Sequence, residues 1–172
     1  MNSIYIDIEL SKTGLKIPKF KSGKLIHSKY DPEKEAINLV NNIDENSFYL
    51  VTGIGAGFFI KKLSEKYPNS KIVAIENSQD DIDFLEKHFQ IISELKMNNV
   101  IITTTENLYN SAKEIKFDEF KEEVIIKCTS GSGENFIYSP KKNNDEKMIV
   151  KRMNYALKQN PYWYSREWNY KN

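Results

Sequence analysis

The chain has 172 residues, 40% of them hydrophobic and 28% charged, a composition typical of a single globular domain. Its 25 Lys and Arg side chains nearly balance 24 Asp and Glu, which gives a net charge of +1. This balance excludes binding to nucleic acid or anionic lipid through overall charge. One cysteine and two histidines exclude a disulfide framework and leave too few ligands for a structural zinc site.

No apolar run approaches the roughly 20 residues that span a bilayer. The first ten residues carry Asp7 and Glu9 in place of the basic head and apolar core of a secretion signal. We therefore expect a cytoplasmic protein with no membrane partner and no bound metal.

Residues 1–30 are predicted to form a small antiparallel β meander. Isoleucines alternate with other residues from Ile4 to Ile8, the period of a half-buried strand. Two shorter extended pieces, 15–18 and 24–27, follow it across turn residues.

Residues 31–140 are predicted to form a Rossmann-like α/β domain. Asp31-Pro32 announces a helix, because Asp caps free backbone N–H groups and Pro suits the first helical turn. Four short apolar strands follow, at 48–51, 72–75, 100–102 and 124–126. Predicted helices alternate with them at about 58–66, from Ser78 through Leu95, and at 106–115. This alternation predicts a mostly parallel sheet with helices on both faces.

A glycine-rich turn joins the first two strands of this domain. Gly53, Gly55 and Gly57 precede a helix, and Glu76 ends the next strand, 23 residues after Gly53. Glycines let a ligand approach the N–H groups at a helix start, and an acid so placed suits ribose hydroxyls. We therefore predict these four residues as the cofactor-binding site. The bulky Phe58 makes the loop more similar to the loops that bind S-adenosylmethionine than to those that bind NAD.

Two alternatives stay open for this loop. A methyltransferase loop usually has an acid two residues before its first glycine, where this chain has Val51. The ligand is therefore either S-adenosylmethionine or another nucleotide-type molecule. Otherwise the glycines serve only the strand-to-helix turn.

A second loop, Cys128 to Asn135, follows the fourth strand and is rich in small and hydroxyl-bearing residues. Such a loop suits a phosphate, but it lacks the Lys of a P-loop, and we expect an ordinary flexible connection. Cys128 beside a buried strand is typical of the core. No catalytic residue is assigned.

Residues 141–172 differ in composition from the rest of the chain. They hold eight basic and three acidic side chains and six aromatic ones. Aromatic and basic residues mark protein interfaces more often than single-stranded nucleic acid sites. We expect a helix followed by a docking segment that binds another protein or a second copy of the chain.

Three features of the sequence resemble a known family. They are the run His27-Ser28-Lys29-Tyr30-Asp31-Pro32, the glycines from Gly53 to Gly57, and Ile75-Glu76. Over about residues 14–127 they resemble the amino-terminal domain of motility accessory factor (Maf) proteins, which are bacterial flagellin glycosyltransferase-like proteins. The resemblance implies an accessory module whose chemistry belongs to a second domain, outside these 172 residues. It implies a glycosyltransferase domain or a flagellin-type protein as partner.

Two functions are consistent with these observations, and the sequence leaves open whether the protein is an enzyme. The first is an accessory Rossmann-like module for flagellin glycosylation that binds a nucleotide-type ligand. The second is a small S-adenosylmethionine-dependent methyltransferase.

Overall fold

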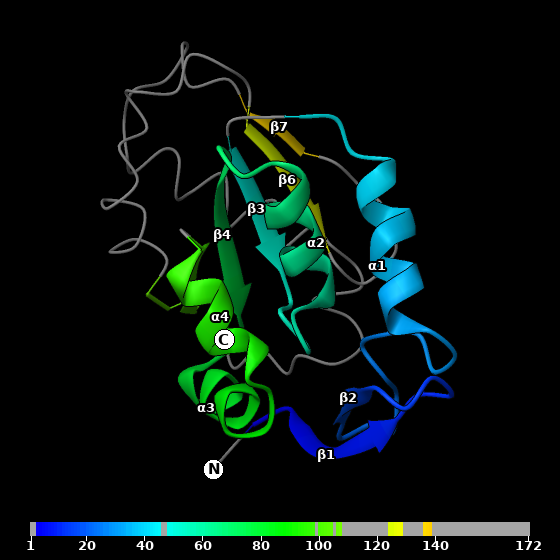
Figure 1. Ribbon diagram of the computed structural model, residues 1–172. Coiled ribbons are helices and arrows are strands. Elements are labelled where there is room, and N and C mark those ends of the chain that lie inside the picture. Colours follow the sequence, from blue (N-terminus) through cyan, green and yellow to red (C-terminus); the bar gives the residue numbers. More distant parts are fainter. Residues whose placement is uncertain are drawn as a thin grey trace.

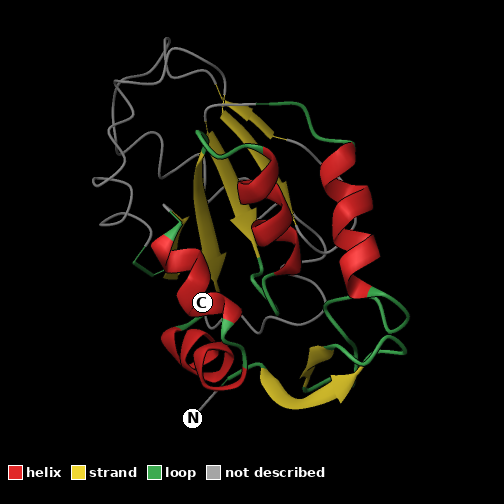
Figure 2. Ribbon diagram, in the orientation of Figure 1, coloured by secondary structure: helices red, strands yellow, loops and turns green. Residues whose placement is uncertain are grey.

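The structure is a computed structural model. It describes residues 3–45, 48–98, 100–104, 106–107, 124–128 and 136–138. Figures 1 and 2 show a central sheet with helices packed against it and a small β-hairpin near the N-terminus.

The central sheet has five strands in the order β5-β4-β3-β6-β7. They are β3 Phe48–Thr52, β4 Lys71–Glu76, β5 Val100–Thr104, β6 Val124–Cys128 and β7 Phe136–Tyr138. Parallel pairing joins β5, β4, β3 and β6, and β7 is antiparallel to β6. The fold is thus α/β with a mostly parallel sheet, as the sequence predicted.

Helix α1 spans Pro32–Asn41 and begins where Asp31-Pro32 predicted. The Asp31 carboxylate accepts the N–H of Lys34 at 2.9 Å, which satisfies a donor that the helix itself cannot pair. Helix α2 spans Phe58–Lys66 and packs against α1.

The helix predicted to run from Ser78 through Leu95 is interrupted. It forms two helices, α3 Gln79–His88 and α4 Ile91–Met97, because Phe89 adopts an extended backbone with its ring buried. Neither glycine nor proline marks this break, so helical spacing alone gave no sign of it.

Helices α2 and α4 contact each other and lie in front of the sheet in Figure 1. Helices on both faces remain a prediction, because most of the segment predicted as a helix at 106–115 lies outside the described residues. No helix of the described part is long and apolar enough to cross a membrane.

The predicted N-terminal meander has two strands, not three. Strands β1 Tyr5–Leu10 and β2 Lys16–Phe20 pair antiparallel. The third piece contributes only an isolated bridge between Lys19 and Leu25. Beyond that bridge, Ile26 and His27 approach the glycine-rich turn of the central domain.

One hydrophobic core joins the hairpin to the central domain. Tyr5 and Phe20 of the hairpin belong to the same buried cluster as Tyr49 and Val51 of β3. The division of the chain at residues 30 and 140 remains a prediction, and the segment 141–172 lies outside the described residues.

Candidate functional site

The glycine-rich turn lies at the carboxyl end of β3. Gly53, Gly55 and Gly57 all have positive φ angles, of 78°, 56° and 78°, which side chains with a Cβ rarely adopt. The N–H of Gly53 donates to the carbonyl of Ile75 at 2.8 Å and so fixes the turn to β4. The three glycines are needed for the backbone path itself.

Glu76 lies beneath this turn and is fully buried. Its Oε1 accepts the N–H groups of Ile54 at 2.6 Å and Gly55 at 3.2 Å, and the hydroxyl of Tyr5 at 2.9 Å. Its other oxygen, Oε2, has no hydrogen-bond partner among the described residues. The carboxylate therefore accepts backbone donors of the kind that a bound phosphate would use.

Burial also changes the acidity of this group. Loss of hydration and, to a smaller extent, the nearby Asp81 raise the pKa of Glu76 to about 7, while the hydrogen bonds from the turn and Tyr5 oppose the shift. Burial and the adjacent Glu76 raise the pKa of Tyr5 well above its usual value, so the phenol stays protonated and donates.

His27 covers the same turn from the other side. Its Nε2 accepts the N–H of Ala56 at 2.8 Å. Burial lowers the pKa of His27 to about 3, so the ring is neutral at physiological pH and its lone pair is free to accept. A Cβ added at Gly55 would lie 2.4 Å from this Nε2, so only glycine fits beneath the ring.

Asp81 in the first turn of α3 holds the beginning of the chain. Its carboxylate accepts the Ser3 hydroxyl at 2.8 Å, the Ile4 N–H at 2.7 Å and the Ser78 hydroxyl at 2.6 Å. Ser78 caps α3 by accepting the N–H of Asp81. The carboxylate of Asp81, however, serves the N-terminal segment 78 residues away in the chain.

The structure thus brings the four predicted residues together, but Glu76 bonds to the turn and to Tyr5. Cofactor binding at Gly53, Gly55, Gly57 and Glu76 stays a prediction. Sequence reasoning missed the contacts of Tyr5 and His27 with this site, since no spacing links Tyr5 to the glycines and His27 was noted only as part of a resemblance.

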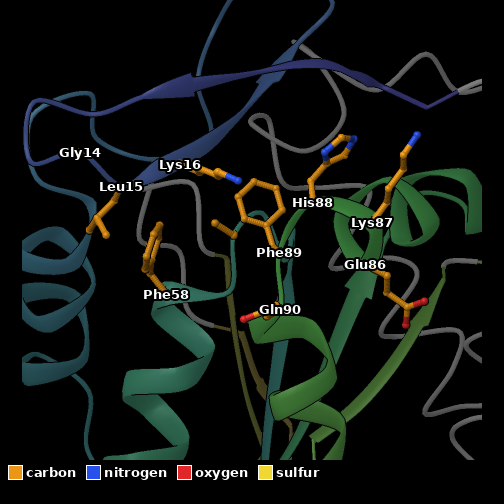
Figure 3. Close-up of a pocket in the computed structure, with 10 residues that line it drawn as sticks. Gly14, Leu15, Lys16, Phe58, Glu86, Lys87, His88, Phe89 and Gln90 are labelled. Carbon is orange, nitrogen blue, oxygen red and sulfur yellow. The ribbon is translucent and has the colours of Figure 1, made fainter.

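A cavity of about 650 Å³ opens beside the turn. It is lined by residues 14–16 of the hairpin, Ala56 and Phe58 at the start of α2, and residues 86–90 at the break between α3 and α4 (Figure 3). Among the described residues, no group of three His, Cys, Asp or Glu side chains is arranged to hold a metal ion.

Comparison with known proteins decides the family. A family model described as TupA-like ATPgrasp matches residues 61–172. The chain belongs to the TupA-like ATP-grasp family. No curated protein matches the chain.

The family match begins within α2 and leaves out the glycine-rich turn at 53–57. It includes the loop that joins β6 to β7 and the aromatic segment 141–172. Of the four predicted cofactor-binding residues, the match therefore includes Glu76 and leaves out the three glycines.

This match corrects two predictions. The resemblance to motility accessory factor proteins and the function in flagellin glycosylation drawn from it were wrong, and so was the S-adenosylmethionine-dependent methyltransferase. The residues on which these two predictions rested have local structural roles in this chain. Asp31 caps α1, His27 covers the turn, and the glycines adopt positive φ angles. Such features recur wherever a strand leads into a helix, so they do not discriminate between families.

Proposed function

We propose that this chain binds ATP, and that the loop following β6 holds the phosphates. The observation that carries the proposal is membership of the TupA-like ATP-grasp family, whose name specifies ATP and whose match contains this loop. A nucleotide-type ligand was expected from the sequence, but at a different loop.

The composition of the loop supports a phosphate site. It reads Thr129-Ser130-Gly131-Ser132-Gly133 and directly follows Lys127 and Cys128 of β6. Hydroxyls and glycine N–H groups are donors that suit phosphate oxygens, and the ammonium of a lysine neutralises their charge. The residues of the loop itself, 129–135, lie outside the described part of the chain.

The place of the loop in the sheet supports the same proposal. Strand β6 runs parallel to β3, and Cys128 pairs with Thr52. The loop therefore begins at the carboxyl edge of the sheet, where open parallel sheets bind their ligands. It connects two antiparallel strands, since β7 returns beside β6.

A second candidate keeps the nucleotide at the glycine-rich turn with Gly53, Gly55, Gly57 and Glu76. For that site, Tyr5 and His27 have to withdraw, because they bond to Glu76 and to the N–H of Ala56.

Calorimetric titration with ATP in the presence of Mg²⁺ tests the proposal. We expect Lys127→Gln to weaken binding by about tenfold, the loss of one charge-assisted contact. The matched control, Lys21→Gln, removes the same charge from an exposed position in the hairpin and should change nothing.

A third variant separates the two loops. Glu76→Gln keeps the shape of the buried side chain and should leave ATP affinity unchanged if the phosphates lie at the loop after β6. Loss of binding in Glu76→Gln with full binding in Lys127→Gln would place the nucleotide at the glycine-rich turn. Absence of ATP binding by the unmodified chain would refute both sites.

A binding partner is also proposed for the C-terminal segment. The basic and aromatic segment 141–172 is proposed to dock a glycosyltransferase-type protein or a second copy of the chain. Its composition supports this, with six aromatic side chains and an excess of basic ones.

A further inference from the structure

The cavity beside the glycine-rich turn is formed by three segments that are far apart in the chain. The hairpin supplies Gly14, Leu15 and Lys16, the start of α2 supplies Phe58, and the helix break supplies residues 86–90. Its volume of about 650 Å³ lies within the range of small-molecule sites. The interruption between α3 and α4 thus forms one wall of this cavity. The continuous helix expected from the sequence gave no sign of such a wall.

The aromatic walls of this cavity are held in place by neighbouring rings. The edge of the His27 ring meets Phe58 with centroids 5.2 Å apart, and His27 is itself fixed by the N–H of Ala56. On the opposite side, the His88 ring lies 4.6 Å from that of Phe84. A ligand would therefore meet walls that are already ordered.

The charged side chains around the cavity favour an anion. Lys16 and Lys87 form no salt bridge with any carboxylate among the described residues. The one acidic residue of the lining, Glu86, is paired with Lys96. Figure 3 shows Lys16 extending from the hairpin over the cavity, with Phe58 and Gln90 on the side of the helices.

We propose that this cavity binds a small organic anion, a carboxylate or phosphate group attached to a flat apolar body. The Lys16 ammonium binds the anionic end, Lys87 adds positive charge at the rim of the cavity, and Phe58 and Phe89 contact the apolar body. The site goes beyond the proposed ATP site, because its described lining residues come from the hairpin, the start of α2 and the break between α3 and α4.

Titration of the full chain with small probes, followed by amide NMR shifts, tests the proposal. The probes are phenyl phosphate, phenylacetate and the uncharged benzyl alcohol. We expect at least one of the two anions to bind with a Kd of about 1 mM or tighter and to shift the amides of Gly14, Ala56 and Gln90. The tighter anion identifies the group that the site prefers, and benzyl alcohol should bind about fivefold more weakly or not at all.

A pair of double variants supplies the control. The double variant with Lys16→Gln and Lys87→Gln should bind the anionic probes about tenfold more weakly. Lys21→Gln with Lys34→Gln removes the same total charge from exposed positions away from the cavity and should leave the affinity unchanged.

Three results would overturn the proposal. They are the absence of binding by both anions, equal weakening in the two double variants, and equal binding of benzyl alcohol. Displacement of a bound probe by ATP would also overturn it, since the cavity would then be part of the ATP site. Failure of the chain to bind ATP has no bearing on these outcomes, so the two proposals fail separately.

Discussion

Two buried groups at the glycine-rich turn should give the protein a characteristic dependence of stability on pH. The pKa of Glu76 rises from 4.5 to about 7, so the folded state takes up a proton that the unfolded state releases. This contribution is fully present below pH 4.5 and is lost as the pH rises to about 7. At about 1.4 kcal/mol per pKa unit, it is worth about 3 kcal/mol.

His27 has the opposite effect. Its pKa falls from 6.5 to about 3, so the unfolded state binds a proton that the buried ring of the folded state does not bind. The contribution of His27 to the free energy of unfolding is fully present above pH 6.5 and is lost as the pH falls to about 3. The whole contribution is about 5 kcal/mol. Between pH 4.5 and 6.5 the two slopes have opposite signs and nearly equal size, so these two groups together should leave the stability flat.

Glu76→Gln removes one of the two slopes and keeps the shape of the side chain. From pH 6.5 to 4.5, this variant should lose about 3 kcal/mol relative to the unmodified protein, because only the His27 slope remains. Urea unfolding followed by circular dichroism at pH 4.5, 5.5 and 6.5 measures the difference. Glu45→Gln, at an exposed position, is the matched control and should follow the unmodified protein. If the stability of Glu76→Gln followed that of the unmodified protein across this pH range, the buried carboxyl of Glu76 would not hold the proton assigned to it.

Two further predictions concern single positions. Gly55→Ala should lower the free energy of unfolding by about 3 kcal/mol, because the left-handed backbone is strained and the new Cβ meets His27 at 2.4 Å. Gly14→Ala has open space around its Cβ and should lose only about 1 kcal/mol, and equal urea midpoints for the two variants would contradict the close contact. Asp31→Ala should cost about 1 kcal/mol, measured in the same way, because the N–H of Lys34 loses its cap, and an unchanged midpoint would show that the cap is dispensable.

The local elements of this protein follow from short stretches of sequence. Alternation from Ile4 to Ile8 predicted β1, and the apolar runs of the central domain predicted the parallel strands of its sheet. Asp31-Pro32 predicted the start of α1. These features depend on neighbouring residues, since the spacing of apolar side chains and the capping of free N–H groups act within a few positions.

The same local signals misled the assignment of function. A glycine-rich turn with an acid after the next strand is expected wherever a βαβ unit binds a nucleotide, and also wherever the turn needs positive φ angles. The family match lies entirely beyond that turn. It contains the loop after β6, whose sequence has no pattern as familiar as that of the glycines.

The sequence by itself determined the α/β class, the order of the main elements and, through the family match, membership of the TupA-like ATP-grasp family. Only the tertiary structure decided which groups meet the glycine-rich turn. His27 bonds to Ala56 of the turn and Tyr5 bonds to Glu76 beneath it, across 29 and 71 residues of the chain. Periodicity states which face of an element is buried, but the partner of a buried polar group depends on how whole elements pack.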